Sequence, residues 1–166
     1  MGLLSFIKEA GEKLFGKGPA KAAQDAAAQA PTPENLEAAN RAAGEAIAGY
    51  VAAQGLPVQG LDLSFDASTG TVTVAGTVPD QATREKVVLC CGNVERVAAV
   101  NDLLVVDAPQ PESQWHTVVS GDNLSKIAKK FYDDPNKYPV IFEANKPMLT
   151  HPDKIYPGQM LRIPPL

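Results

Sequence analysis

The sequence predicts an α+β protein built from two consecutive units. Apolar residues recur at helical spacing in the first third, and they alternate with polar residues from Leu61 to Phe65. A helix-spaced run from Leu124 to Phe131 then lies between two short stretches of strand-forming residues. Units of this kind pack their helices on one face of a sheet. The prolines of residues 107–113 predict a stiff linker between the two units.

An amphipathic helix and an alanine-rich segment are predicted within residues 1–33. A helix is expected from Gly2 to Phe15, because apolar residues recur there at intervals of three and four. These residues are Leu3, Ile7, Ala10 and Leu14. The alanine-rich stretch from Lys17 to Pro33 has little to bury and is interpreted as a linker or a loosely held helix.

The first unit, residues 34–106, is predicted to contain a helix, a hairpin, a second helix and a strand. The expected elements are a helix from Pro33 to about Ala53, strands at 61–65 and 71–78, a helix from Asp80 to Cys91, and a strand at 100–106. Gly92 is expected to end the second helix in a left-handed conformation, because glycine adopts it without steric cost.

The second unit, residues 114–166, is predicted to be a βααβ unit whose two strands pair. Asn123 stands at the N-cap of its first helix. The remaining elements are a strand at 115–119, a turn at 120–122, a second helix from Lys137 to Ala144, a turn at Pro157–Gly158, and a strand from Met160 to Ile163.

Composition excludes several classes of protein. The net charge of −4 comes without a basic patch, which argues against a nucleic-acid partner. No apolar run has the length of a membrane span, and Lys8 and Glu9 interrupt any apolar core of a secretory signal. The adjacent Cys90 and Cys91 are expected to be reduced helix residues, because neighbouring cysteines rarely form an unstrained disulfide. We therefore expect a cytoplasmic monomer.

The second unit closely resembles a LysM domain. The resemblance rests on three ordered blocks, His116–Ala128, Glu143–Pro147 and Lys154–Pro164. It implies a groove between two loops that binds glycans containing N-acetylglucosamine, such as peptidoglycan fragments. The implied groove residues are Gly121, Asp122, Asn123 and Leu124, and opposite them Ile155, Tyr156 and Pro157. The alternative is that the first of these loops only turns a strand into a capped helix.

The first unit resembles a BON domain through the blocks Gly70–Val78 and Gly92–Asn101. The whole chain is similar to small cytoplasmic potassium-binding proteins of Gram-negative bacteria that carry both modules. That similarity implies a potassium ion held by main-chain carbonyls. Carried over by motif, the implied ligands are the carbonyls of Ile7, Ala10, Gly92, Val94 and Val97.

Three functions remain to be weighed. A potassium sensor would use the ion to fasten the N-terminal helix to the first unit, because carbonyls freed at helix C-termini suit a large, weakly hydrated cation. A glycan-binding protein would use the LysM groove. An enzyme is not expected, because His116 and His151 are interpreted as surface or packing residues and Asp133–Asp134 as part of a turn.

Overall fold

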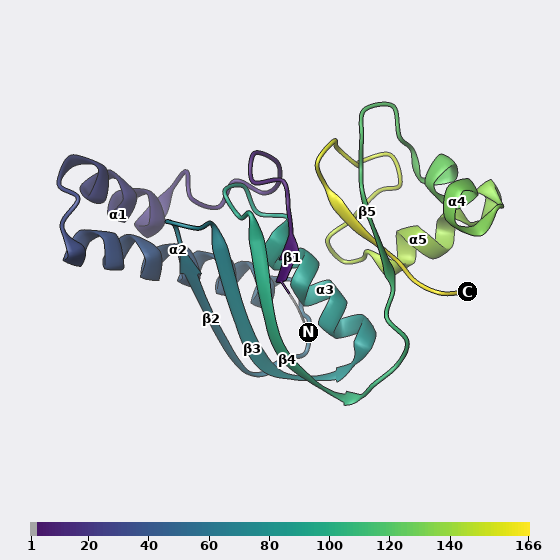
Figure 1. Ribbon diagram of the computed structural model, residues 1–166, viewed down its shortest axis with the longest axis horizontal. Coiled ribbons are helices and arrows are strands. Elements are labelled where there is room, and N and C mark those ends of the chain that lie inside the picture. The colour runs from purple at the N-terminus through teal and green to yellow at the C-terminus, as the bar shows by residue number, and fades with distance from the viewer. Residues whose placement is uncertain (1–2) are drawn as a thin grey trace.

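The computed structural model describes residues 3–166 and arranges them as two α+β units in a row (Figure 1). Within this range a four-stranded sheet with helices is followed by a two-stranded sheet with helices, which confirms the predicted fold class. The helices are α1 (Gly18–Gln29), α2 (Pro33–Ala53), α3 (Gln81–Gly92), α4 (Leu124–Tyr132), the 3-10 helix η1 (Pro135–Lys137) and α5 (Tyr138–Ala144). The strands are β1 (Leu3–Ser5), β2 (Gln59–Asp66), β3 (Thr71–Asp80), β4 (Ala99–Ala108), β5 (Gln114–Thr117) and β6 (Met160–Ile163).

The sheet of the first unit has the strand order β1-β4-β3-β2. Strands β2 and β3 form an antiparallel hairpin, whereas β3 and β4 run parallel and are joined by α3, since parallel neighbours need a crossover connection. Helices α2 and α3 lie behind the strands in Figure 1. Strand β1 pairs antiparallel with β4 and ends at Ser5, opposite Ala99. The chain after β1 therefore runs past the turn that joins α3 to β4.

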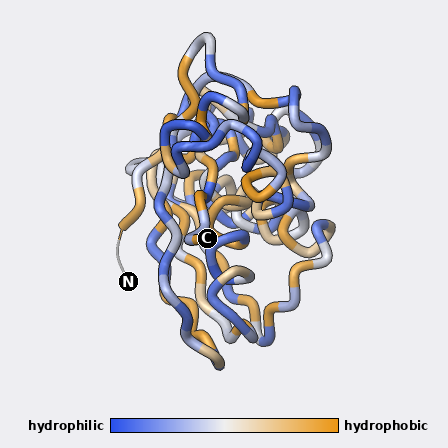
Figure 2. The backbone as a smooth tube through the Cα atoms, turned by 90° about the vertical axis from the view of Figure 1, so that its right-hand side faces the viewer, coloured by the Kyte–Doolittle hydropathy of each residue, from blue (hydrophilic) through white to orange (hydrophobic). Residues whose placement is uncertain are grey.

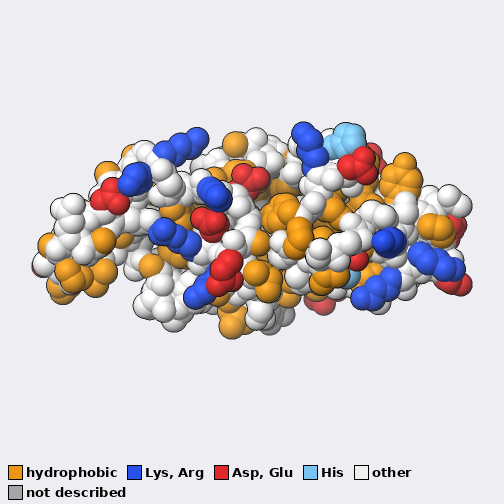
Figure 3. All heavy atoms as spheres, turned by 90° about the horizontal axis from the view of Figure 1, so that it is seen from above, with side chains coloured by type: hydrophobic (Ala, Val, Ile, Leu, Met, Phe, Trp, Pro, Cys, Tyr) orange, Lys and Arg blue, Asp and Glu red, His pale blue; other side chains and the backbone are white. Residues whose placement is uncertain are grey.

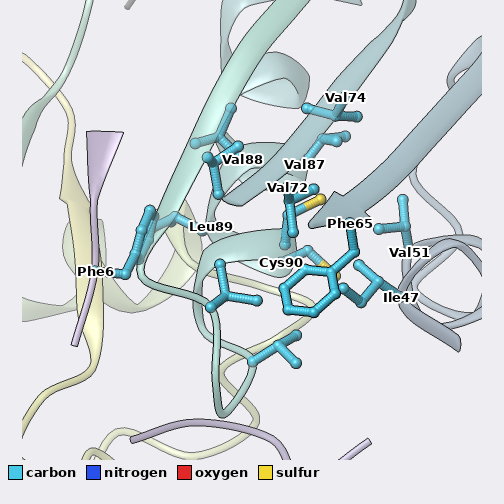
Figure 4. Close-up of a cluster of buried hydrophobic side chains, with 14 of the residues drawn as sticks. Phe6, Ile47, Val51, Phe65, Val72, Val74, Val87, Val88, Leu89 and Cys90 are labelled. Carbon is cyan, nitrogen blue, oxygen red and sulfur yellow. The ribbon is translucent and has the colours of Figure 1, made fainter. Parts of the chain in front are cut away.

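The core of the first unit lies between the sheet and these helices. Val72, Val74 and Val78 alternate along β3 and have no exposed surface. Figure 4 shows Val72 and Val74 beside Val87 of α3, and Ile47 of α2 belongs to the same cluster. Figure 2 shows the apolar and polar stretches that follow one another along the backbone. Strand-period patterning thus fixes which face of the sheet the helices cover.

The predicted N-terminal helix from Gly2 to Phe15 is wrong. Gly2 lies outside the described residues, and the chain from Leu3 to Ser5 is strand β1. The helical pattern placed Leu3 and Ile7 on a buried face, yet these side chains are 64% and 47% exposed, while Phe6 is buried. A short helix gains little stability by itself, so pairing with the open edge of β4 and burial of Phe6 determine the structure instead.

The alanine-rich stretch forms helix α1 and not a linker. It packs against α2, and the two helices make a hairpin that projects at one end of the molecule in Figure 1. Ala20 and Ala27 are buried in α1. Thr32 caps α2, its hydroxyl accepting a hydrogen bond from the Asn35 amide at 3.2 Å.

The second unit has the predicted βααβ order. Strands β5 and β6 pair antiparallel, with Thr117 opposite Met160. Asn123 caps α4, its side chain accepting a hydrogen bond from the Lys126 amide at 2.8 Å. The helices and the sheet enclose a second core, formed by Val118, Leu124, Ile127, Ala128, Ile141, Leu149, Leu161 and Ile163. None of the helices within residues 3–166 combines the length and apolar character needed to cross a bilayer.

Candidate functional site

The chain just after β1 is joined to the first unit by main-chain hydrogen bonds. We call residues 3–15 the N-terminal segment and residues 93–98 the α3–β4 turn. A parallel bridge pairs Glu12 with Val94. Four bonds connect the two stretches: Phe6 N to Ala98 O at 2.8 Å, Glu12 N to Asn93 O at 2.9 Å, Glu95 N to Glu12 O at 2.9 Å, and Arg96 N to Lys8 O at 2.5 Å. The two peptide segments are thereby held side by side along their length.

Glycines allow this close approach. Gly11 has φ +118°, and a β-carbon placed on it would lie 2.4 Å from the carbonyl oxygen of Asn93. A β-carbon on Gly92 would lie 2.0 Å from the ring of Phe6. Neither contact is possible with a side chain present. Gly11 interrupts the helical pattern in the sequence, and in the structure it allows this approach to Asn93.

The expected left-handed conformation of Gly92 is wrong. Gly92 is the last residue of α3 and does not have a positive φ, and Asn93 caps the helix at φ −83°. The left-handed residue of the turn is Arg96, with φ +84°. Gly92 is therefore required for the space that the Phe6 ring occupies and not for its backbone conformation.

Carbonyl oxygens of these two segments, and of Gly92 at the end of α3, retain unused acceptor capacity. Those of Ala10, Gly92 and Val97 accept no hydrogen bond from any residue within 3–166. Those of Ile7 and Val94 accept one each, from Ala10 N at 3.1 Å and from Val97 N at 3.0 Å, and a carbonyl oxygen has two lone pairs. Across the described residues, no group of three or more His, Cys, Asp or Glu side chains could hold a metal ion. Neutral main-chain oxygens are instead the donors available, and they suit a large monovalent cation.

The second unit covers the outer side of the N-terminal segment. A β-carbon on Gly158 would lie 2.7 Å from Cβ of Ala10 and 3.4 Å from Cγ2 of Ile7. The turn before β6 thus packs against the side chains of Ile7 and Ala10. The structure brings the expected ion-site residues onto two bonded segments, with a third segment packed against one of them.

Three weakly acidic side chains near this junction, Tyr156, Cys90 and Tyr50, have raised pKa values. Burial, with a smaller contribution from the nearby negative charge of Glu12, raises the pKa of the Tyr156 phenol and of the Cys90 thiol to about 12 each. Burial also raises the pKa of Tyr50. These three groups therefore stay protonated and uncharged at neutral pH.

A buried ion pair fixes the second unit to α3. The Glu85 carboxylate lies 2.8 Å from the guanidinium of Arg162, and the two side chains are only 3% and 8% exposed. Ser113 donates to Glu85 through its amide at 2.8 Å and its hydroxyl at 2.7 Å. Gln81 donates a further bond at 3.1 Å. Sequence reasoning missed this network, because Glu85 and Arg162 are 77 positions apart and have ordinary local surroundings.

Two of the expected glycan-groove residues, Asn123 and Leu124, line a hollow in the second unit. It has a volume of about 530 Å³, which is within the range of small-molecule sites. Asn123 and Leu124 are on one wall, and the opposite wall is residues 151–153. Gly121 precedes this wall with φ +92°, and Asp122 accepts hydrogen bonds from His116 at 2.8 Å and from the Val119 amide at 3.0 Å.

The other expected groove residues, Ile155, Tyr156 and Pro157, do not line this hollow. Ile155 packs against the second core. Tyr156 and Pro157 precede Gly158, at the contact with the N-terminal segment.

Comparison with known proteins identifies both units and the whole chain. The LysM domain model matches residues 116–164, and the BON domain model matches residues 47–108. The chain is 38% identical over 164 residues to the potassium binding protein Kbp of Escherichia coli, covering 99% of each chain. A protein of Deinococcus radiodurans described as uncharacterized is 49% identical over 49 residues, covering 30% of this chain and 19% of its own.

Proposed function

The chain belongs to the family of the potassium binding protein Kbp, and on this premise we propose that it binds potassium through main-chain carbonyls. The proposed ligands are those of Ile7, Ala10, Gly92, Val94 and Val97. One observation carries the proposal: the Ala10, Gly92 and Val97 carbonyls accept no hydrogen bond within residues 3–166, although they lie on segments bonded to each other. The C-terminal end of α3 adds partial negative charge there.

In this proposal the bound potassium ion holds two segments of the chain together. The ion draws the N-terminal segment against the α3–β4 turn, and the protein becomes more compact, as a sensor of ion concentration requires. The proposed role of the protein is to bind an ion and not to catalyse a reaction. Its proposed location is the cytoplasm, in line with the free and buried Cys90 and Cys91. Figure 3 shows basic and acidic side chains interspersed on the face that it displays, which does not favour a polyanionic partner.

Ion-dependent stability tests the proposal directly. A ligand that binds only the folded state stabilises it by about 2.7 kcal/mol at a hundredfold excess over its dissociation constant. We expect the melting temperature of ion-free protein to rise with added potassium and much less with sodium. A melting curve unchanged across millimolar potassium would contradict potassium binding.

A glycine variant tests the location of the site. Gly11→Ala should abolish potassium binding, because the new methyl group collides with the Asn93 carbonyl and separates the two segments. Gly18→Ala is the matched control, since Gly18 has φ +68° and no atom within 4 Å of its added β-carbon. Removal of the whole segment is a poorer test, because Phe6 and Phe15 belong to the buried core.

Glycan binding is a second candidate, favoured by the hollow at Asn123 and Leu124. Titration with an N-acetylglucosamine oligomer, followed by amide chemical shifts, would test it. Shifts at residues 123–125 and 151–153 that saturate, and that weaken in His151→Ala, would support a glycan site. Shifts absent from both walls would contradict it.

A further inference from the structure

The side chain of Asn93 acts as a neighbouring strand for β6. Its amide nitrogen donates to the Met160 carbonyl at 2.8 Å, and its amide oxygen accepts from the Met160 amide at 2.9 Å. The two residues are 67 positions apart and lie in different units. Both main-chain groups of a buried residue on the open edge of a two-stranded sheet are thus satisfied from the first unit.

A second asparagine repeats this arrangement within the second unit. Asn145 donates to the Arg162 carbonyl at 3.0 Å and accepts from the Arg162 amide at 2.9 Å. An isolated pair of strands is marginally stable, and an exposed edge leaves its peptide groups unpaired. The edge of β6 is thus paired by two asparagines, Asn145 from within the LysM domain and Asn93 from the first unit.

The main chain of Asn93 also holds the N-terminal segment. Its carbonyl accepts a hydrogen bond from the Glu12 amide at 2.9 Å, and its amide donates to Leu89 in α3 at 2.9 Å. Gly11 packs directly on its carbonyl. The carbonyls of Gly92 and Val94, on either side, are proposed ion ligands. Asn93 thus joins α3, the N-terminal segment and β6.

We propose that Asn93 is a positioning residue for the ion site, through which ion binding and docking of the LysM domain become one event. This inference rests on the proposed potassium site. The Asn93 side chain fixes Met160, and Met160 lies two residues after Gly158, which packs against Ile7 and Ala10. A change in the carbonyl geometry at residues 92–94 is therefore transmitted to β6, and a displaced β6 loosens the turn that carries the Ile7 and Ala10 carbonyls.

Two asparagine variants with matched controls test the inference. Asn93→Leu keeps the approximate volume of the side chain and removes both bonds to Met160. Asn145→Leu removes the same pair of bonds inside the LysM domain, and Asn136→Leu changes an exposed asparagine of η1. Potassium affinity is measured by isothermal titration calorimetry, and protection of the Met160 amide by hydrogen exchange with and without potassium.

We expect Asn93→Leu to bind potassium about tenfold more weakly, equivalent to about 1.4 kcal/mol, and to lose the potassium-dependent protection of the Met160 amide. Asn145→Leu should lower the melting temperature and weaken potassium binding less than Asn93→Leu does, and Asn136→Leu should change neither. Asn93→Asp keeps the acceptor for the Met160 amide and loses the donor, so its affinity should be intermediate. If Asn93→Leu does not fold, potassium affinity and protection of the Met160 amide are measured on Asn93→Asp instead.

The outcomes separate this inference from the proposed function. Wild-type protein that does not bind potassium overturns the proposed function and the inference with it. Wild-type binding together with unchanged affinity in Asn93→Leu overturns the inference alone. Equal losses of affinity in Asn93→Leu and Asn145→Leu also overturn it, because the effect would then come from general loss of stability.

Discussion

Helix α3 makes two contacts that hold the molecule together, and they use opposite chemistry. Near its start, Glu85 is an ion-paired side chain buried against Arg162 of the second unit. At its end, Gly92 has no side chain, and the α3–β4 turn meets the N-terminal segment through peptide groups. The first contact depends on charge and hydrogen bonding. The second depends on the space that a residue without a side chain leaves for its neighbour.

This difference indicates how each contact responds to change. Removing one partner of a buried ion pair strongly destabilises the folded protein, because the other charge remains buried away from water. A glycine contact is insensitive to charge and is broken by one methyl group. The proposed ion site lies at the contact built from peptide groups, where main-chain carbonyls are the proposed ligands.

Removing one partner of the ion pair should have the largest effect. Glu85→Ala leaves the Arg162 guanidinium buried without its carboxylate, so we expect the free energy of unfolding to fall by about 3–5 kcal/mol. Urea denaturation measures it. Asp25→Ala is the control, because its pair with Lys21 is more than half exposed and should contribute about 0.3–0.5 kcal/mol. Similar losses in both variants would contradict the special role of the buried pair.

Adding one methyl group at the glycine contact should have the next largest effect. Gly92→Ala forces the Phe6 ring out of its place, and overpacking of this kind costs about 1–3 kcal/mol. Gly49→Ala in α2 meets no atom within 4 Å and should instead stabilise the helix by about 0.5–1 kcal/mol.

A double variant separates the contact from the helix itself. If the Phe6 ring is the cause, Phe6→Leu combined with Gly92→Ala should lose less stability than the sum of the single variants. Strict additivity in urea denaturation would show that the ring and the glycine do not interact.

The contact between the LysM turn and the N-terminal segment should give a smaller difference. Gly158 and Gly121 have φ +91° and +92°, so alanine at either position brings similar strain, about 1–2 kcal/mol. Only Gly158→Ala also places a methyl group against Ala10. We expect Gly158→Ala to lower the melting temperature more than Gly121→Ala does, and equal shifts would mean that this contact contributes nothing.

Acid should slightly weaken the contact between Glu85 and Arg162. Burial alone would raise the pKa of Glu85, but hydrogen bonds from Ser113, Gln81 and Arg162 outweigh it and hold the pKa below its ordinary 4.5. A lowered folded-state pKa means that the contribution is complete above pH 4.5 and is lost as the pH falls through the lower value.

The difference in unfolding free energy between wild type and Glu85→Gln isolates this contribution from other acids. It should be constant near neutral pH and become smaller well below pH 4.5. A difference that stays the same in acid would show that Glu85 is not the titrating group.

Most of the fold could be predicted from local sequence patterns. Alternation along β3, the capping asparagine before α4 and the Pro157–Gly158 turn each act within a few residues, so their signals survive in the sequence alone. The family, with its BON and LysM domains, was likewise identified from ordered blocks of residues and confirmed by comparison. The proposed ion ligands came only from that resemblance, because the side chains of Ile7, Ala10, Val94 and Val97 do not mark a carbonyl site.

Contacts between distant segments could not be predicted in the same way. Leu3, Ile7, Ala10 and Leu14 have helical spacing, but the open edge of β4 exists only once the sheet has formed, and it turns Leu3–Ser5 into a strand. The role of Gly92 was misassigned for the same reason, since the Phe6 ring that needs its space comes from 86 positions earlier in the chain.

The sequence by itself determined the two units, their order and the family, because hydrophobic period, caps and turns are local properties. Only the tertiary structure decided how Asn93, Glu85 and Gly158 connect those units. Each of these residues acts through a partner far along the chain, and that partner becomes adjacent only after folding has brought the two segments together.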